Sequence, residues 1–303
     1  MTLTPPPIST ARSRSQLGLV FGFSAYAIWG LLTMYWKVLK SFDAFELIGW
    51  RISLSTIVLV PFTLVTRRFI PLLRSLRNRQ LLVRIILASV LLSINWCTYV
   101  WAVVNGHVVE TALGYFIAPI FTLVIGVFGL HEHLRPIQRI AVGFAIAGVI
   151  VLTAGYGSVP YIALTLASSW SAYGLLKKQV TLDPFESLTA EVLVLCVPAV
   201  LLVAVSWRSV DSIPNSASAY QWVFVLLLGV ATTVPLLLFA GAAHRTPLTI
   251  LGPMQYLVPT INFLLGWLLY NEDVSATKLV GFGLIWVCLA LVISSSVALR
   301  QRA

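Results

Sequence analysis

The feature that most constrains this chain is the series of long apolar runs that fills it. The runs carry few charged side chains and cover residues 17–36, 47–66, 85–104, 111–130, 140–157, 159–176, 187–206, 221–242, 247–270 and 279–298. A helix needs about 20 apolar residues to cross the ~30 Å hydrocarbon core of a bilayer. Strands of a membrane barrel are shorter and alternate in polarity. The pattern therefore predicts an all-α integral membrane protein with ten transmembrane helices.

The composition agrees with a membrane protein and excludes most other classes. Hydrophobic residues make up 59% of the 303 residues and charged residues 10%, whereas globular domains carry roughly 25% charged residues. The connectors are too short for a soluble domain, and the G-x-x-x-x-G-K-[ST] motif is absent. His131-Glu132-His133 lacks the spacing of a zinc protease helix. We expect no enzymatic activity, no cofactor and no metal.

The first apolar run is expected to remain as a helix rather than to be removed as a signal peptide. Arg12 and Arg14 precede it, and Ala25-Tyr26-Ala27 resembles a signal-peptidase site. The run nevertheless continues to Trp36, which makes it long enough to span a bilayer. The three cysteines lie inside runs, so neither a disulfide nor a metal role is expected for them: Cys97, Cys196 and Cys288.

The excess of basic residues gives the orientation of the helices. The chain has 20 Lys and Arg against 10 Asp and Glu. When the connectors are assigned to alternate sides, 15 basic residues share the side of the N-terminus, and the other side holds Lys37, Lys40, Arg208 and Lys278. Short cytoplasmic loops of membrane proteins are enriched in Lys and Arg. Both termini are therefore expected in the cytoplasm, and the basic residues mark topology and lipid contact rather than a nucleic-acid surface.

The chain repeats itself after 140 residues. This offset relates Asp43 to Asp183, Phe45 to Phe185, Glu46 to Glu186, Pro119 to Pro259, Gly126 to Gly266, Glu132 to Glu272 and Gly143 to Gly283. Each copy holds five runs, an odd number, so the second copy crosses the membrane in the opposite sense. Inverted repeats are typical of secondary transporters, whose substrate site lies near the midplane between the repeats. We expect cytoplasmic tails at 1–16 and 299–303 and repeats at 17–157 and 158–298.

Several stretches are similar to a known family of transporters. They include Asn95-Trp96, Trp101-Ala102-Val103, Leu113-Gly114-Tyr115-Phe116-Ile117 and Gln255-Tyr256. These stretches resemble the RarD-type branch of the EamA family, in the drug/metabolite transporter superfamily, from about Gly18 to Val297. The resemblance implies a ten-helix permease of the bacterial inner membrane built from two EamA units, and relatives that export amino acids and other metabolites.

Two ionisable residues are the main candidates for a transport site. Across the ten runs, Arg51 and Glu191 are the only Asp, Glu, Lys or Arg residues, and they occupy equivalent positions of the two repeats. Charged side chains inside a bilayer are costly and normally face the protein interior. We expect Arg51 to bind an anionic group of the substrate and Glu191 to act in proton or cation coupling. The alternative is a structural role, with Arg51 paired to Glu46 or Glu110.

The third run carries the most polar helix face. On a helical projection Asn95 and Tyr99 share one face with small residues, and Trp96 and Trp101 lie on either side of it. We expect this face, with Asn105, to line the substrate site, and helix–helix packing is the alternative. For His107 and Glu110, at the outer end of this helix and the next, a water-exposed rim is favoured over a gate or proton relay.

Prolines and further aromatic residues complete the candidate set. Pro119 and Pro259 fall near the middle of the fourth and ninth runs, where a proline bends a helix as a fixed kink or a hinge. Side chains near these prolines, and in the first helix of each repeat, offer contacts to a flat amphipathic solute: Tyr115, Gln255, Tyr256, Trp29 and Tyr173.

Together these patterns predict a secondary transporter that exports a small amphipathic metabolite, amino acid or drug-like compound by alternating access. Its partners are this small-molecule substrate and the lipid bilayer. A channel is one alternative, although it would show a wide polar stripe along several helices. A membrane scaffold or scramblase-like module is another.

Overall fold

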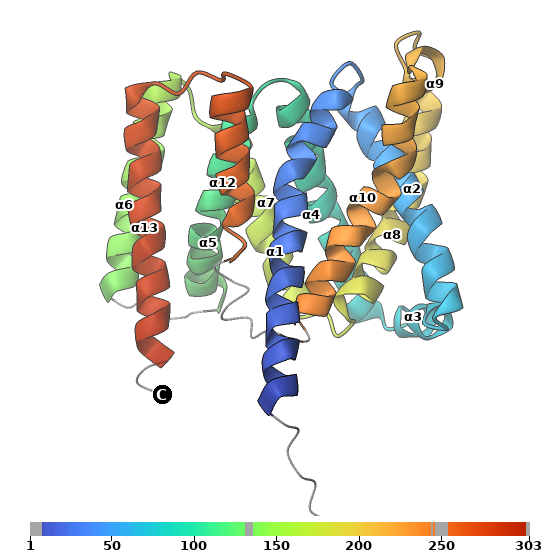
Figure 1. Ribbon diagram of the computed structural model, residues 1–303, viewed down its shortest axis with the longest axis horizontal. Coiled ribbons are helices and arrows are strands. Elements are labelled where there is room, and N and C mark those ends of the chain that lie inside the picture. Colours follow the sequence, from blue (N-terminus) through green and yellow to red (C-terminus); the bar gives the residue numbers. More distant parts are fainter. Residues whose placement is uncertain (1–7, 131–135, 244, 246–253, 301–303) are drawn as a thin grey trace, which may run out of the picture.

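The chain folds into a bundle of helices that run between the same two ends of the molecule. The computed structural model describes residues 8–130, 136–243, 245 and 254–300, and within these residues it contains helices and turns but no strand. Figure 1 shows α1 rising from one end of the bundle and α13 returning to it. We call this end the lower end and the opposite end the upper end.

Each half of the chain contributes five long helical segments and one short helix to the described structure. The first half contains α1 (Ile8–Val38), α2 (Ala44–Val65), the short α3 (Phe69–Ser75), α4 (Arg79–Val104), α5 (Val108–Leu130) and α6 (Pro136–Tyr156). The second half contains α7 (Tyr161–Lys178), α8 (Pro184–Ser206), the short α9 (Ile213–Ser216), α10 (Ala219–Ala243), α12 (Leu257–Leu264) with the π-helical turn η1 (Leu265–Leu269), and α13 (Ala276–Arg300).

The starts of α1 and α12 depart furthest from the apolar runs. Helix α1 begins at Ile8, so the helix extends below the first predicted span at the lower end (Figure 1). Helix α12 begins at Leu257, which places Pro259 in its first turn. The prediction of a mid-helix position for Pro259 is therefore wrong, because a first-turn N–H has no intrahelical acceptor and proline is tolerated there. Pro119 lies inside α5, as expected.

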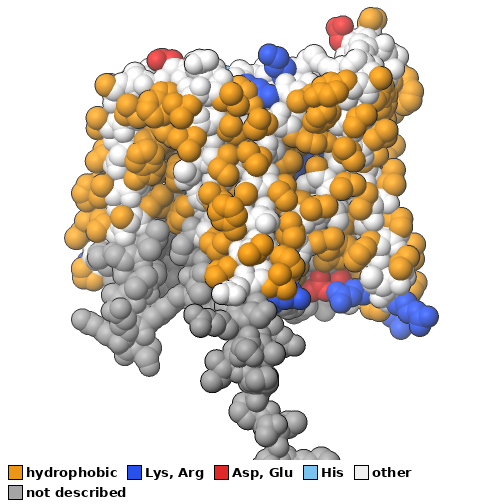
Figure 2. Space-filling model, viewed as in Figure 1, with side chains coloured by type: hydrophobic (Ala, Val, Ile, Leu, Met, Phe, Trp, Pro, Cys, Tyr) orange, Lys and Arg blue, Asp and Glu red, His pale blue; other side chains and the backbone are white. Residues whose placement is uncertain are grey.

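The surface is that of a membrane protein. Five helical segments are long and apolar enough to cross a bilayer: Gln16–Val38, Ala44–Val65, Arg79–Val104, Pro184–Ser206 and Ala219–Ala242. Shorter apolar helical stretches are Val108–Thr122, Val142–Gly155, Leu257–Leu269 and Ala276–Leu291. Figure 2 shows hydrophobic side chains over the flank of the bundle, with charged side chains gathered mainly near its two ends. Exposed apolar surface of this extent is stable against lipid rather than water.

The main contacts between helices follow the repeat. Each of these contacts is reproduced when every helix is replaced by its equivalent in the other half. Helix α2 packs on α8 and α6 packs on α13, and these pairs join equivalent helices of the two halves. The contact of α1 with α10 has its counterpart in α7 with α4, and that of α5 with α7 has its counterpart in α12 with α1. The two halves are thus intertwined rather than separate bundles.

The repeat is also visible in the way α2 and α8 begin. The carboxylate of Asp43 accepts hydrogen bonds from the backbone N–H groups of Phe45 and Glu46 at the start of α2. Asp183 accepts the equivalent bonds from Phe185 and Glu186 at the start of α8. Both aspartates satisfy N–H groups that lack intrahelical acceptors. Because α2 starts at the upper end and α8 at the lower end (Figure 1), the two caps lie at opposite ends of the molecule.

A close approach of α10 to α2 depends on a glycine. A Cβ atom added at Gly229 would lie 2.5 Å from the backbone oxygen of Leu54, so no other residue fits without moving one helix. One turn along each helix, this approach brings Thr232 of α10 beside Arg51 of α2. The glycine therefore helps to position the site described next.

Candidate functional site

Arg51 is buried where α2, α4 and α10 meet. Its residue is 7% exposed. Nε donates a hydrogen bond of 3.1 Å to Oγ1 of Thr232, which donates in turn to the carbonyl of Leu228 at 2.9 Å. The guanidinium carbon lies 3.9 Å from the ring centroid of Trp96 and 5.5 Å from that of Trp36. The arginine is therefore held by a hydroxyl at one nitrogen and by indole faces around its charge.

The charge of Arg51 has no carboxylate partner among the described residues. Glu46 accepts a hydrogen bond of 2.9 Å from the backbone N–H of Ile213, and Glu110 lies 3.5 Å from Nδ1 of His107. Neither forms the ion pair with Arg51 that was the structural alternative. The terminal guanidinium nitrogens donate to no described acceptor, since the Nε bond to Thr232 is the one hydrogen bond that the side chain makes there.

Polar side chains of four further helices lie around Arg51. Tyr99 and Tyr115 lie close enough to interact electrostatically with Arg51, and their ring centroids are 5.9 Å apart. The hydroxyl of Tyr115 donates to Oδ1 of Asn95 at 3.1 Å. The hydroxyl of Tyr99 lies 2.8 Å from Oγ1 of Thr33, which donates to Oδ1 of Asn262 at 2.8 Å. Residues of α1, α4, α5 and α12 thus form buried hydrogen bonds with one another, whereas the hydrogen bond of Arg51 goes to α10.

Asn95 also ties this network to α7. Its Nδ2 donates to Oγ of Ser169 at 3.1 Å and to the carbonyl of Leu166 at 3.2 Å. The side-chain oxygen and nitrogen of Asn95 therefore form their hydrogen bonds with protein groups, and the residue is 1% exposed. Asn95 holds α4, α5 and α7 together, whereas Arg51 presents unused donors.

Glu191 is also buried, but its charge is paired. Its residue is fully buried, and Oε1 lies 2.8 Å from Nζ of Lys177 and accepts a hydrogen bond of 2.9 Å from Oγ of Ser187. Oε2 accepts a bond of 3.0 Å from the hydroxyl of Tyr173. Lys177 also donates to Ser187. Lys177, which the sequence assigned to a cytoplasmic connector, lies in the last turn of α7 and reaches back to neutralise the carboxylate.

The remaining candidates of α4 and α5 form a rim at the upper end. The rings of Trp101 and His107 stack with centroids 5.7 Å apart. Asn105 is exposed at the C-terminus of α4, where its Nδ2 donates to the carbonyl of Trp101. His107 and Glu110 border a small pocket of about 140 Å³ with Glu272, Asp273 and Lys278. Asn105 and Trp101 thus belong to this rim and not to the surroundings of Arg51.

Three other candidates have contacts elsewhere. Trp29 packs against Tyr26 and Phe239, with ring centroids 5.6 and 5.8 Å away. Gln255 is exposed, and Tyr256 packs against a core cluster formed by α5, α6, α7, α12 and α13. None of their described ring contacts or hydrogen bonds reaches Arg51.

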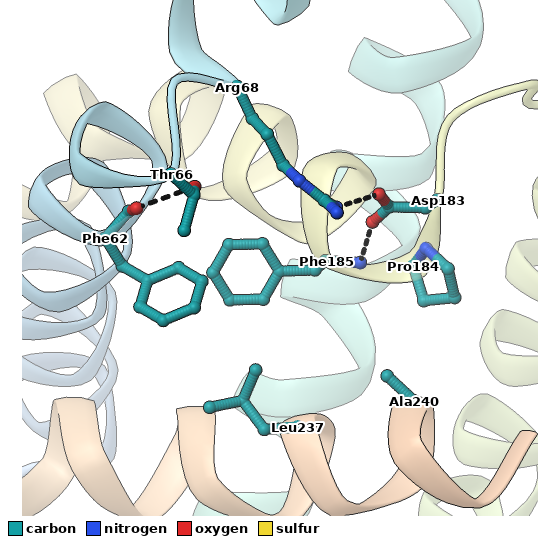
Figure 3. Close-up of a pocket in the computed structure, with 8 residues that line it drawn as sticks. All are labelled: Phe62, Thr66, Arg68, Asp183, Pro184, Phe185, Leu237 and Ala240. Atoms are coloured by element: carbon teal, nitrogen blue, oxygen red, sulfur yellow. Dashed lines mark hydrogen bonds and ion pairs between the residues drawn. The ribbon is translucent and has the colours of Figure 1, made fainter. Parts of the chain in front are cut away.

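A larger pocket that the sequence did not suggest opens at the lower end, between α2, α8 and α10 (Figure 3). It has a volume of about 500 Å³ and is lined by Phe62, Thr66, Arg68, Asp183, Pro184, Phe185, Leu237 and Ala240. Figure 3 shows Arg68 reaching over the pocket to Asp183, and Nη1 lies 2.7 Å from Oδ2. The rings of Phe62 and Phe185 face one another with centroids 4.8 Å apart.

The sequence does contain a signal for this ion pair. The offset of 140 residues relates Arg68 to Arg208 and Asp183 to Asp43. Arg208 and Asp43 lie at the upper end, beyond α8 and before α2, and both are exposed there. Within the described residues the lower pair is in contact at 2.7 Å and the upper pair forms no ion pair.

The described residues contain no group of three His, Cys, Asp or Glu side chains that could hold a metal ion. His131, Glu132 and His133 lie outside the described residues. Cys97, Cys196 and Cys288 are free thiols.

Comparison with known proteins identifies the family. The chain matches the EamA-like transporter family over residues 16–154 and again over residues 159–294. It is 41% identical to Protein RarD of Streptomyces exfoliatus, over 97% of this chain and 93% of that protein. It is 36% identical to the uncharacterized transporter YojE of Bacillus subtilis (strain 168), over 96% of this chain and 98% of that protein.

A solved structure supports the fold. This crystal structure of another protein superposes on the chain with a TM-score of 0.60 at 18% sequence identity. The match covers 90% of this chain and 96% of the other. At this identity the likeness concerns the fold alone. The two family matches and the relatives show that the chain belongs to the EamA-like transporter family, as a RarD-type multi-pass membrane transporter.

Proposed function

We propose that the protein is a gradient-driven exporter of a small amphipathic solute, with ten transmembrane helices in two inverted repeats. The substrate binds at Arg51, near the interface of the repeats, and exchanges between the two sides of the bacterial inner membrane by alternating access. No cofactor takes part. The observation that carries this proposal is the buried guanidinium of Arg51, which has no carboxylate partner among the described residues.

A buried charge without a partner is unfavourable unless a ligand compensates it. Insertion of a charge into the bilayer interior costs at least ~2.5–3.5 kcal/mol, and protein interiors normally pair such a charge. Trp96 and Trp36 contribute cation–π contacts but leave the charge of Arg51 in place. A solute whose anionic group binds the terminal nitrogens removes this unfavourable charge, which gives the site its affinity.

The orientation that we propose places the lower end in the cytoplasm. The basic residues of α3 and its flanking turns, among them Arg67, Arg68, Arg74 and Arg77, lie there with the start of α1 and the end of α13 (Figure 1). The positive-inside rule favours this assignment. The upper end, with Arg208, Lys37 and Lys278, then faces the periplasm.

The two equivalent Arg–Asp pairs differ between the ends of the molecule, and this difference supports alternating access. In an inverted-repeat transporter, the inward-facing and outward-facing states interchange the roles of the two halves. The pair Arg68–Asp183 joins α2 to α8 at the lower end, whereas Arg208 and Asp43 form no ion pair at the upper end. We propose that the second conformation separates the lower pair and forms the upper pair.

Glu191 is proposed as the coupling site. A proton taken up by its carboxylate leaves Lys177 as an unpaired ammonium, which favours release of α7 from α8 at the lower end. In this way the proton gradient drives the separation of α7 from α8 at the proposed cytoplasmic end. Replacement of Glu191 by Gln is expected to leave solute binding intact and to remove the pH dependence of exchange, whereas Glu186→Gln is the matched control.

Counterflow in proteoliposomes tests the proposed function. Purified protein is reconstituted with an unlabelled solute inside, and uptake of the labelled solute is followed from outside. An alternating-access carrier gives transient accumulation that depends on the internal solute, and Arg51→Gln abolishes it. A channel gives equilibration without accumulation, and a scaffold gives no flux, so either result contradicts the proposal.

A further inference from the structure

We infer that the solute bound at Arg51 is an organic monoanion without a cationic group, so that amino-acid zwitterions and uncharged drug-like compounds are poor ligands. The inference deepens the proposed function and rests on it, because it names the chemical class of the solute at the same site. It is carried by the charges and the unused hydrogen-bond donors around Arg51.

Among the residues that the structure describes, Arg51 is the one positive charge in the interior of the bundle without a carboxylate partner. Arg51 and Glu191 are the only Asp, Glu, Lys or Arg residues inside the apolar runs. Glu191 is already neutralised by Lys177 at 2.8 Å. Residues 246–253, which lie outside the described structure, contain no Asp or Glu. An ammonium group of a zwitterion would therefore find no free carboxylate near Arg51.

The unused polar atoms near Arg51 include a further side-chain donor. Nε1 of Trp36 is buried and has no hydrogen-bond acceptor among the described residues. The ring centroid of Trp36 lies 5.5 Å from the guanidinium carbon. A buried donor without an acceptor is unfavourable. A carboxylate, which only accepts hydrogen bonds, complements this arrangement, whereas an ammonium adds more donors.

The ligand should carry a single negative charge and a flat apolar part. One guanidinium compensates one charge, so a dianion would leave an unpaired negative charge in the interior. The two free terminal nitrogens match the two oxygens of a carboxylate. The rings of Trp96, Tyr99 and Tyr115 lie close to Arg51 and provide an aromatic surface for the rest of the molecule.

A series of four compounds of similar size and different charge tests the inference. Phenylacetate is the monoanion, phenylacetamide is its neutral isostere, phenylalanine is a zwitterion and phenethylamine is a cation. Binding to the full-length protein in detergent is measured by thermal shift and by equilibrium dialysis. We expect phenylacetate to bind roughly tenfold or more tightly than each of the other three, as charge-assisted hydrogen bonds to a buried arginine imply.

Variants show whether the selectivity comes from Arg51. Arg51→Gln should remove the preference for phenylacetate, and Arg51→Lys should keep a weaker one, because lysine retains the charge but not the planar pair of donors. Arg79→Gln changes an exposed arginine at the start of α4 and should leave binding unchanged. If Arg51→Gln does not fold, Arg51→Lys still provides the comparison.

The outcomes separate this inference from the proposed function. Absence of phenylacetate binding, or equally tight binding of phenylalanine or phenylacetamide, overturns the inference. Selective binding of phenylacetate without any counterflow supports the inference and contradicts the transport function. Counterflow of a neutral or zwitterionic solute alone supports transport and overturns the inference that the solute is a monoanion.

Discussion

Arg68 and Asp183 form an ion pair of 2.7 Å that joins the end of α2 to the start of α8. The two side chains are 53% and 34% exposed. Exposed ion pairs are worth about 0–1 kcal/mol, so this contact can break at little cost in free energy. The carboxylate of Asp183 keeps its place when the pair opens, because Phe185 and Glu186 bind its other oxygen.

We expect the lower and upper pairs to form alternately. In a background without Cys97, Cys196 and Cys288, one variant carries Arg68→Cys with Asp183→Cys and another carries Arg208→Cys with Asp43→Cys. A short bifunctional thiol reagent should link the lower pair in resting protein, and a proton gradient that drives the cycle should shift linkage toward the upper pair. Equal linkage at both ends under all conditions would contradict alternation.

The hydroxyl of Thr232 should stabilise the fold through Arg51. Thr232→Val removes the acceptor of the Nε bond and leaves another buried donor unpaired, which should lower the free energy of unfolding by ~1–3 kcal/mol. Thr233→Val is the control, because the Thr233 hydroxyl bonds only to the carbonyl of Gly229 in its own helix. Thermal melts of both variants in detergent compare the effects. A similar loss in both would show that Arg51 does not depend on Thr232.

Loss of Lys177, the partner of Glu191, should destabilise the protein more than loss of Lys178, the exposed lysine beside it. Lys177→Met leaves a buried carboxylate unpaired, and removing one partner of a buried pair costs about 3–5 kcal/mol. Because the Lys177 side chain is 22% exposed, we expect the lower part of this range. Lys178→Met, next along the chain and exposed, should have little effect. Adding Glu191→Gln to Lys177→Met should restore stability, and failure of this rescue would contradict the pairing.

The two helix caps give a matched comparison between the ends of the molecule. Asp43→Ala and Asp183→Ala should each reduce the free energy of unfolding by ~1 kcal/mol through loss of a cap. Asp183→Ala should be slightly worse, because it also breaks the contact with Arg68. Asparagine caps helices as well as aspartate does, so Asp183→Asn should lose only the ion pair. Chemical denaturation measures all of these, and an effect of Asp43→Asn as large as that of Asp43→Ala would contradict a capping role.

The sequence predicts the helices and the relation between the halves better than it predicts which side chains meet. Apolar length indicates most of the helical segments, and the offset relates Asp43 to Asp183 and Arg51 to Glu191, because these properties are local or repeat along the chain. The partner of Glu191 is missed because Lys177 lies just beyond an apolar run and reaches across from α7 to α8. Asn105 is expected on the face of Asn95 and Trp101 beside that face, but their depth near the end of α4 places both on the rim. Pro259 is misplaced because a long apolar run does not reveal where α12 begins.

The lone charge of Arg51 has an electrical consequence for the proposed transport cycle. With Lys177 and Glu191 paired, the empty site carries one positive charge, and the site loaded with a monoanion carries none. The loaded step is then insensitive to the transmembrane voltage, whereas return of the empty site moves positive charge through the field. One elementary charge in a drop of 100 mV corresponds to about 2.3 kcal/mol. An interior-negative membrane thus draws the empty site back toward the cytoplasm, and export of the anion gains its direction from the voltage itself.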